Sequence, residues 1–477
     1  MTRIKFQIIY FVFALLILSG CKTLQSNLAI PEKKIPENYS TVSTDTTTIA
    51  KINWRDYFDD ELLLNLIDTA LVGNPDLQII LQRIEIARAG VRFSSGELMP
   101  KVDGNILAGS TRYGKFTESG QGNATTPYPD DPNRIIPNPI SDYFIGLTST
   151  WEIDIWGKLR NLRKSAVAQY LSSLEGTKFV VSNLVADVAI SYYELLALDN
   201  ELDIIRQTIV KQQEAYDVVK LQKEAGRATE LAVQQFQATL LDSQAFEKET
   251  LQQITEMENK INFLLGRFPQ SIERKKETLF AEIPQQISSG VPSQLLLSRP
   301  DIREAEYQVQ ASKFDLKAAK TSFLPNINIA AGLGFQSFNA QFLLNHTSLG
   351  YTSAGGLLAP LLNMNALKAQ FNKAKANQLT AMYNYQKTIL NGYVEVVNEL
   401  SKLEYLQQVN TLRQQQNDVL IQSVETSGDL YRYGRATYLE VLLAQQNSLE
   451  TQLELISTTK RQRIATVNIY KALGGGW

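Results

Sequence analysis

The sequence predicts a mainly α-helical chain with a small β part, built from two copies of a very long helical hairpin. The tetrapeptide Gly-Arg-Ala-Thr occurs at Gly226 and again 208 positions later at Gly434. Before each copy, roughly 65 residues contain no proline, and a helix of that length would span about 100 Å. Such a helix is much longer than a compact globular domain needs. The function should therefore depend on reach rather than on a chemical site.

The duplication sets the expected domain organisation. In chain order the segments are a lipoprotein signal peptide (1–20), an extended lipid-anchored tether (21–50), a first repeat (51–282) with a β-hairpin at 102–154 and a long helical hairpin at 158–266, a linker (283–299), and a second repeat (300–477) with a β-hairpin at 326–358 and a long helical hairpin at 366–473.

Each repeat begins with a short helix. Asn74-Pro75-Asp76 supplies a capping side chain, a proline at the first helical position and an early acid. That helix should end before Pro100, because a residue preceding proline avoids the helical region. Arg299-Pro300-Asp301 repeats the pattern up to Pro325. Arg299 is a poor cap, so this second start depends on Pro300.

The segment after each short helix has the period-two pattern of a strand. The alternating apolar positions are Ile145, Leu147, Trp151 and Ile153 in the first copy, and Ile327, Ile329, Ala331, Leu333 and Phe335 in the second. Residues 102–113 and 349–358 are the expected partner strands, and the first hairpin carries a long Pro/Gly/Asn-rich loop at 114–140. Strands of about ten residues can cross a bilayer, but four cannot close a barrel, and known membrane barrels begin at eight. Either several chains share one barrel, or two soluble hairpins pack on the helices.

Heptad spacing predicts that the long helices coil around each other rather than only filling a core. The proposed seams are Leu202, Ile205, Ile209, Gln212, Tyr216 and Val219, and Leu439, Leu442, Gln446, Leu449, Leu453 and Ile456. Gly226 and Gly434 then lie where each hairpin reverses, since glycine suits the left-handed cap of a helix. Thr229 and Thr437 are placed to cap the returning helices.

The N-terminus has the pattern of a targeting segment. Arg3 and Lys5 precede an apolar run, 6–18, that is too short to span a bilayer. The sequence Leu-Ser-Gly-Cys then ends at Cys21, as in a bacterial lipobox, where cleavage before the cysteine is followed by its acylation with lipid such as palmitate. The alternative is a free cysteine after an ordinary signal anchor. Acylation at Cys21 by more than one chain would give stable membrane attachment.

Composition excludes several functions. A net charge of −2 with interspersed lysine and glutamate gives no basic surface for nucleic acid. One cysteine and one histidine leave no basis for a metal cluster or a histidine-dependent catalytic site. Glu152 and Asp154 share a strand face, but no nucleophile accompanies them. No phosphate-binding loop occurs. We therefore expect no enzymatic activity and no cofactor other than the lipid on Cys21.

A row of polar side chains precedes the second hairpin turn. Asp418, Gln422, Glu425 and Asp429 are spaced by four, three and four residues, so they share one helical face. If that face lines a duct, symmetry turns these positions into rings of carboxylates that form a candidate gate and select cations. The alternative is a solvated outer face.

Four stretches closely resemble the outer-membrane factor family, the TolC/OprM-like exit ducts of tripartite efflux pumps, and its lipoprotein branch in particular. They are 151–160 (WEIDIWGKLR), 291–302 (VPSQLLLSRPDI), 323–325 (FLP) and 470–477 (YKALGGGW). With the internal duplication they cover nearly the whole mature chain. The sequence departs from the family at Asn363-Met364-Asn365, where many members keep an Asp/Gly-type turn.

The resemblance implies a homotrimer in the bacterial outer membrane. Three chains would form a twelve-stranded transmembrane barrel and a TolC-like twelve-helix α-barrel projecting into the periplasm. The tips, Gly226-Arg227-Ala228-Thr229 and Gly434-Arg435-Ala436-Thr437, would dock on a periplasmic adaptor (a membrane fusion protein), and an inner-membrane transporter of the RND type would supply the energy. The function implied is a passive efflux or secretion channel opening at its periplasmic tip. The alternative is a non-transport lipoprotein that tethers envelope layers. The exported substrate is not encoded in any motif.

Overall fold

The computed structural model describes residues 28–31, 34–37, 39, 48–128, 131–281, 289–360, 362 and 364–477. The proposed signal peptide, Cys21 and much of the tether lie outside the described residues, as do Asn363 and part of the linker. The chain divides into two compact units. A strand unit contains Ile86–Tyr170 and Gln308–Tyr383, and a helical unit contains the described residues of Glu32–Glu85, Leu171–Tyr307 and Asn384–Trp477.

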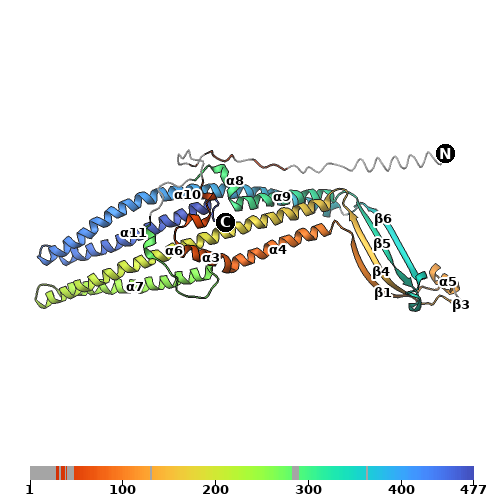
Figure 1. Ribbon diagram of the computed structural model, residues 1–477, viewed down its shortest axis with the longest axis horizontal. Helices are drawn as coiled ribbons and strands as arrows, with labels where there is room; N and C mark the ends of the chain where they lie inside the picture. Colours follow the sequence, from red (N-terminus) through yellow and green to blue (C-terminus); the bar gives the residue numbers. More distant parts are fainter. Residues whose placement is uncertain are drawn as a thin grey trace. The chain divides into compact units, whose positions relative to one another are not determined.

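The helices and strands follow the duplication (Figure 1). The helices are α2 (Trp54–Tyr57), α3 (Glu61–Gly73), α4 (Pro75–Gly96), α5 (Glu118–Thr125), α6 (Lys158–Glu224), α7 (Glu230–Leu264), α8 (Leu295–Ser298), α9 (Pro300–Thr321), α10 (Met364–Arg432) and α11 (Tyr438–Ala472). The strands are β1 (Lys101–Thr111), β2 (Pro127–Tyr128), β3 (Asp131–Ile135), β4 (Ile140–Ile153), β5 (Asn326–Ser337) and β6 (Leu349–Leu358).

Both long hairpins and both short helices are confirmed. α6 contains 67 residues and α10 contains 69, and each is followed by a returning helix of 35 residues. The strand predictions are confirmed as well, since β1, β4, β5 and β6 form one antiparallel sheet in that order. The loop at 114–140 differs from expectation. It contains α5, which Thr117 caps, and the small β2–β3 hairpin, although its composition is typical of irregular loops.

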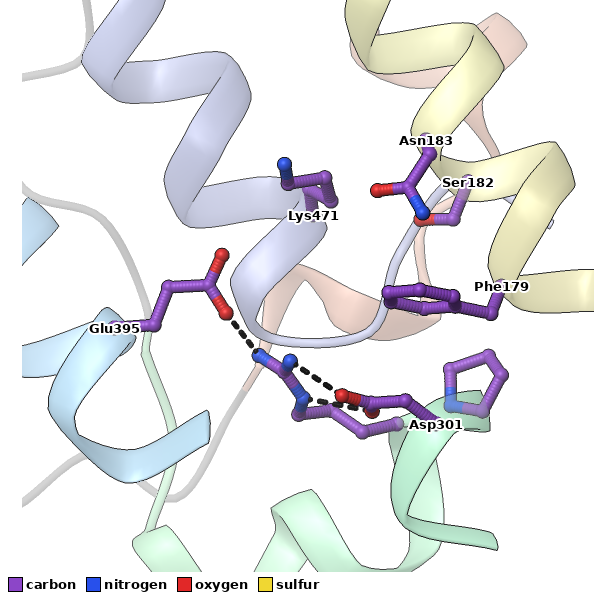
Figure 2. Close-up of a pocket in the computed structure, with 8 residues that line it drawn as sticks. Phe179, Ser182, Asn183, Asp301, Glu395 and Lys471 are labelled. Atoms are coloured by element: carbon purple, nitrogen blue, oxygen red, sulfur yellow. Dashed lines mark hydrogen bonds and ion pairs between the residues drawn. The ribbon is translucent and has the colours of Figure 1, made fainter. Parts of the chain in front are cut away.

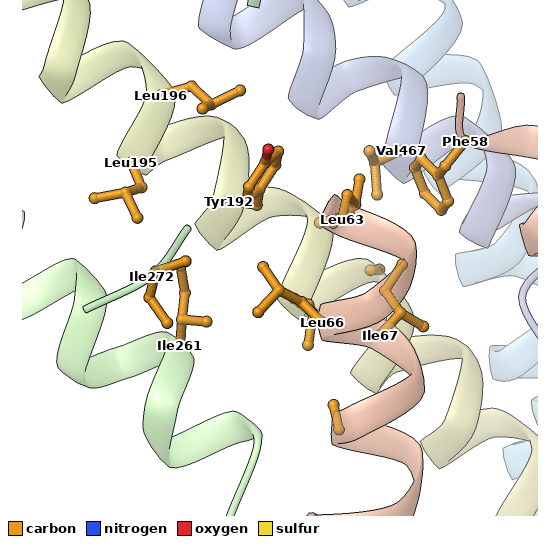
Figure 3. Packing of buried hydrophobic residues seen from close by; sticks show 14 of the residues in the cluster. Phe58, Leu63, Leu66, Ile67, Tyr192, Leu195, Leu196, Ile261, Ile272 and Val467 are labelled. Atoms are coloured by element: carbon orange, nitrogen blue, oxygen red, sulfur yellow. The ribbon is translucent and has the colours of Figure 1, made fainter. Parts of the chain in front are cut away.

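The core of the helical unit lies where α3 packs on the middle of α6 (Figure 3). Leu63 and Ile67 of α3 are fully buried, as are Tyr192 and Leu195 of α6. The Tyr192 hydroxyl donates a 2.9 Å hydrogen bond to Asp60, which also caps α3. Burial and this carboxylate raise the pKa of Tyr192 well above its ordinary value.

One stretch of α6 has the composition of a membrane span. It is apolar enough over an 18-residue window to pass for one, but 56% of that window is buried within the protein. Burial of this kind is expected of a core helix, and the window coincides with the part of α6 that packs on α3.

One predicted seam is confirmed and the other is wrong. On α6, Leu202, Ile205, Gln212 and Val219 are buried, while Ile209 and Tyr216 are half-buried. On α11, Leu439 and Gln446 are exposed, Leu442, Leu449 and Leu453 are only half-buried, and of the predicted set Ile456 alone is buried. The packed face is instead formed by Val441, Ala444, Ser448 and Thr451. The buried face of α11 is thus formed mainly by small side chains, and most of the predicted leucines lie beside it.

Candidate functional site: a two-faced sheet and paired hairpin tips

The four-stranded sheet has one apolar face and one polar face. The strand register places alternate residues of all four strands on a common side. One face carries Val102, Ile106, Ala108, Tyr143, Ile145, Leu147, Trp151, Ile153, Ile327, Ile329, Ala331, Leu333, Phe335, Leu349, Tyr351 and Leu357. The opposite face carries every charged residue of these four strands, namely Lys101, Asp103, Asp142 and Glu152.

The apolar face is open to its surroundings. Ile106 is 80% exposed and Tyr351 is 82% exposed. A contiguous apolar surface of this extent on a soluble protein would be an aggregation liability, whereas it suits a lipid environment. The alternative that two soluble hairpins pack on the helices through this face is therefore wrong.

The polar face is crowded at its centre by backbone. Gly146 and Gly334 are paired across β4 and β5, and a Cβ atom added to Gly146 would lie 2.5 Å from the Gly334 Cα atom. Glycines at such points allow a sheet to bend, with the crowded face inward. The ring of Phe144 covers the same two glycines. The sheet thus curves around its polar face.

Both edges of this sheet are unpaired. β1 and β6 are the outer strands, and neither makes a further strand pairing within the part of the chain that the structure describes. Unpaired backbone N–H and C=O groups cannot be left in a bilayer. The sheet is therefore incomplete as a membrane structure.

The two acids singled out in the sequence have structural roles. Glu152 forms a 3.0 Å ion pair with Lys158. Asp154 accepts hydrogen bonds from the backbone N–H groups of Leu159 and Arg160 at the first turn of α6. Burial pushes the pKa of Asp154 upward, but these hydrogen bonds outweigh it and hold the pKa below its ordinary value. The two acids thus fix the start of the long helix.

The two hairpin turns are closed by local caps. Gly226 and Gly434 both have a positive φ, in the left-handed region that glycine favours. Thr229 accepts a hydrogen bond from the Ala232 backbone N–H. At the second turn, the Glu440 carboxylate accepts hydrogen bonds from the backbone N–H and the hydroxyl of Thr437, the N-cap residue of α11. The Thr229 side chain therefore caps its returning helix as the sequence predicts, whereas at Thr437 the bonds run to Glu440.

The structure brings the two predicted tips together. The Tyr431 hydroxyl of α10 donates a 2.6 Å hydrogen bond to the Gln222 side chain of α6. A small apolar cluster around Val219 and Phe236 includes Ala228 and Tyr431 as well. Arg227 and Arg435, the arginines of the two turns, are exposed. The joined tips thus present their basic side chains to the surroundings.

The candidate gate residues all lie on one open face of α10. Asp418, Gln422, Glu425 and Asp429 are exposed, and Asp429 forms a 3.4 Å ion pair with Arg432. The face of α10 that packs against the rest of the chain carries other residues, among them Leu403 and Leu406. The role of this row as a gate stays a prediction.

Two equivalent joints connect a returning helix to a short helix. In the first repeat, Asn74 donates a 2.9 Å hydrogen bond to the Leu264 carbonyl at the end of α7 and caps α4 through the Leu77 N–H. In the second repeat, the Arg299 guanidinium donates to the Ala472 carbonyl at the end of α11 at 2.7 Å. Position 472 follows 264 by the 208-residue repeat offset. Both side chains thus donate to the end of a returning helix, and Asn74 in addition caps the short helix that follows it.

The second joint is charged (Figure 2). Arg299 is 5% exposed and pairs with Asp301 and with Glu395 of α10, each at 2.8 Å. Burial lowers the pKa of the Arg299 guanidinium, but the two carboxylates outweigh it and the pKa lies above its ordinary value. The cavity beside it holds about 60 Å³. The sequence around Arg299 indicates only a poor cap, because Glu395 lies 96 positions away and no local pattern points to it.

The sequence profile of the outer membrane efflux protein family matches residues 66–267 and 291–475. The chain belongs to this family. The cation efflux system protein CusC of Escherichia coli O6:H1 is 26% identical over 469 residues, 97% of each protein. The probable outer membrane lipoprotein SilC of Salmonella typhimurium is 27% identical over 471 residues, 98% of each. The solved CmeC outer membrane channel of Campylobacter jejuni shares the fold, with a TM-score of 0.82 at 21% identity and 94% coverage of each chain.

These findings establish the role and the location of this outer membrane efflux protein. It has the TolC-like fold, it resides in the bacterial outer membrane, and it is the exit duct of an efflux system. The two-faced sheet is the part of the chain that suits the membrane.

Proposed function

We propose that this protein works as a homotrimer in which three chains close one passive channel. The observation that carries the proposal is the curved four-stranded sheet with an apolar outer face and two unpaired edges. Three sheets of four strands give twelve, and joining β6 of one copy to β1 of the next leaves no edge in lipid. The strand count alone does not set the number of copies, because two copies would already supply eight strands, as many as the smallest known membrane barrel has. The number three is taken from the resemblance to TolC-like channels.

Two measurements test this proposal: the conductance of the protein in planar lipid bilayers, and the mass of the detergent-solubilised protein. We expect a trimer that forms pores. A monomer that forms none would overturn the proposal and would favour the alternative of an envelope tether.

The tips are proposed to dock on a periplasmic adaptor, with an inner-membrane transporter of the RND type as the energy source. The support is the repeated Gly-Arg-Ala-Thr turn, which exposes an arginine at the end of both hairpins, Arg227 and Arg435. The protein itself is proposed to catalyse no reaction and to bind no cofactor apart from its lipid.

The carboxylate row on α10 is proposed to restrict the channel near its tips. Replacing Asp418 and Glu425 with alanine should increase the leak of large antibiotics several-fold in a strain without the adaptor, because the rings of carboxylates that bind cations at the constriction are lost. The measurement is antibiotic uptake in that strain. Asp242→Ala with Glu249→Ala is the matched control, being an exposed pair with the same spacing on α7. Equal uptake by the two double variants would count against a gate.

Cys21 is proposed to carry the lipid anchor. Cys21→Ser should abolish palmitate incorporation and leave an uncleaved precursor, because the acylated thiol is what the processing step recognises. Metabolic labelling with palmitate, with the mass of the purified protein, tests this. Persistent labelling of the serine variant would place the acyl group elsewhere.

A further inference from the structure

α4 carries two apolar stripes on different faces. Ile84 and Val91 lie on the face that packs against the rest of the chain, where Ile84 is buried and Val91 half-buried. Ile86 and Phe93 each follow by two residues, about 200° around the helix, and each is 71% exposed. A heptad stripe that the described residues of its own chain leave exposed is expected to be covered by another chain.

The start of α10 has a matching stripe of smaller residues. Phe371 and Gln378 form its buried face. Ala369 and Ala376 are exposed on roughly the opposite face, followed at the next heptad position by exposed Tyr383. The two alanines leave space on the helix surface into which larger side chains of another helix can insert.

Both stripes continue the unpaired edges of the sheet. α4 leads directly into β1, and β6 leads directly into α10. One flank of the strand unit therefore carries a free strand edge and large side chains, and the other carries a free strand edge and small ones. An interface between unlike flanks is heterologous, the kind that closes into a ring.

We propose that Phe93 and Ile86 of one copy insert at Ala369 and Ala376 of the next copy. The levels along the helices agree. Phe93 lies in the last turn of α4 and Ala369 in the second turn of α10, so both are close to the sheet. Ile86 and Ala376 each lie one heptad further from it. Large side chains thus meet small ones at both levels. This inference rests on the proposed trimer and specifies its seam.

The helical unit also has one exposed stripe of large side chains and one of small ones, but here the large stripe is on α10. Tyr405, Leu412 and Val419 form a heptad stripe on α10, and all three are exposed. On α7 the exposed heptad stripe after Leu231 continues with Ala238 and Ala245. The small row of one copy can therefore receive the large row of the next along the hairpins too.

Disulfide trapping in isolated outer membranes tests the seam. The full-length double variants Ile86→Cys/Ala376→Cys and Phe93→Cys/Ala369→Cys should give covalent dimers and trimers on non-reducing gels after mild oxidation, because a disulfide requires Cα atoms within about 7 Å. Each single variant controls for Cys21. Arg92→Cys/Gln370→Cys is the matched off-stripe pair, at exposed positions next to Phe93 and Ala369.

A size exchange provides a second measurement that does not depend on oxidation. Ala376→Ile should lower the temperature at which the trimer dissociates, and adding Ile86→Ala should restore it, because the removed side chain makes room for the new one. A conducting trimer that cross-links through the off-stripe pair, or that shows no restoration, would overturn the seam while leaving the trimer intact. Failure to form any trimer would overturn the proposed function itself.

Discussion

Leu147→Arg is expected to prevent accumulation of the folded channel in the outer membrane. Leu147 lies near the middle of β4 on the apolar face and is 55% exposed. A charged side chain on the lipid face of a membrane strand costs about 2–4 kcal/mol near the bilayer midplane. In the proposed trimer, three copies of the variant in one barrel incur this cost three times. The measurement is the amount of heat-modifiable trimer in purified outer membranes.

Thr148→Arg is the matched control, because the next residue along β4 lies on the opposite face. Thr148 lies on the polar face, where the Asn105 amide donates a 2.6 Å hydrogen bond to its hydroxyl. The trimer should accumulate normally, and the added positive charge should reduce cation conductance. Equal loss of trimer in both variants would mean that the sheet has no lipid-facing side.

Arg299→Ala is expected to destabilise the folded protein by about 3 kcal/mol, since removing one partner of a buried ion pair leaves uncompensated charge that typically costs about 3–5 kcal/mol. The lower end applies here because the Glu395 side chain is 36% exposed and keeps part of its hydration. The Ala472 carbonyl also loses its donor. Thermal unfolding in detergent measures the effect.

The first joint provides the control for this prediction. Asn74→Ala removes a neutral hydrogen bond and a helix cap, which should cost about 1–2 kcal/mol. Adding Glu395→Gln to Arg299→Ala should recover part of the loss, because one of the two stranded carboxylates is gone. A cost for Arg299→Ala no larger than that for Asn74→Ala would mean that the charges around the second joint contribute nothing.

The long-range architecture could be predicted from the sequence because its signals are local and repeated. Proline-free runs ending in glycine and threonine define the hairpins, and the period-two pattern from Ile327 to Phe335 defines β5. The duplication then supports each assignment twice. The curvature of the sheet was not predictable in this way, because it depends on the pairing of Gly146 with Gly334, which are far apart in the sequence.

The errors have physical causes too. The heptad pattern of α11 predicts a packed face of leucines. A helix in the wall of a helical barrel has neighbours on more than one side, however, and the face that is buried within the chain carries Ala444 and Ser448. The loop at 114–140 looked irregular because α5 contains two glycines, yet Thr117 caps it and its eight residues form a helix. The role of Arg299 depends on Glu395, which only the folding of α10 brings close. The tips needed no such long-range information, since their caps lie within four residues.

The joints at Asn74 and Arg299 also bear on how such a protein can change its length during evolution. In each hairpin the outgoing helix, α6 or α10, is continuous up to the turn, and the returning helix, α7 or α11, ends at the joint. Adding one heptad to the outgoing helix and one to the returning helix beyond that point would move the turn by about 10 Å and preserve the phase of the seam. Insertions of other sizes would rotate the residues beyond them around the helix axis, so that the apolar faces of the two helices would no longer meet. The distance bridged across a cell envelope can therefore be adjusted in discrete increments, without redesign of the membrane-embedded part.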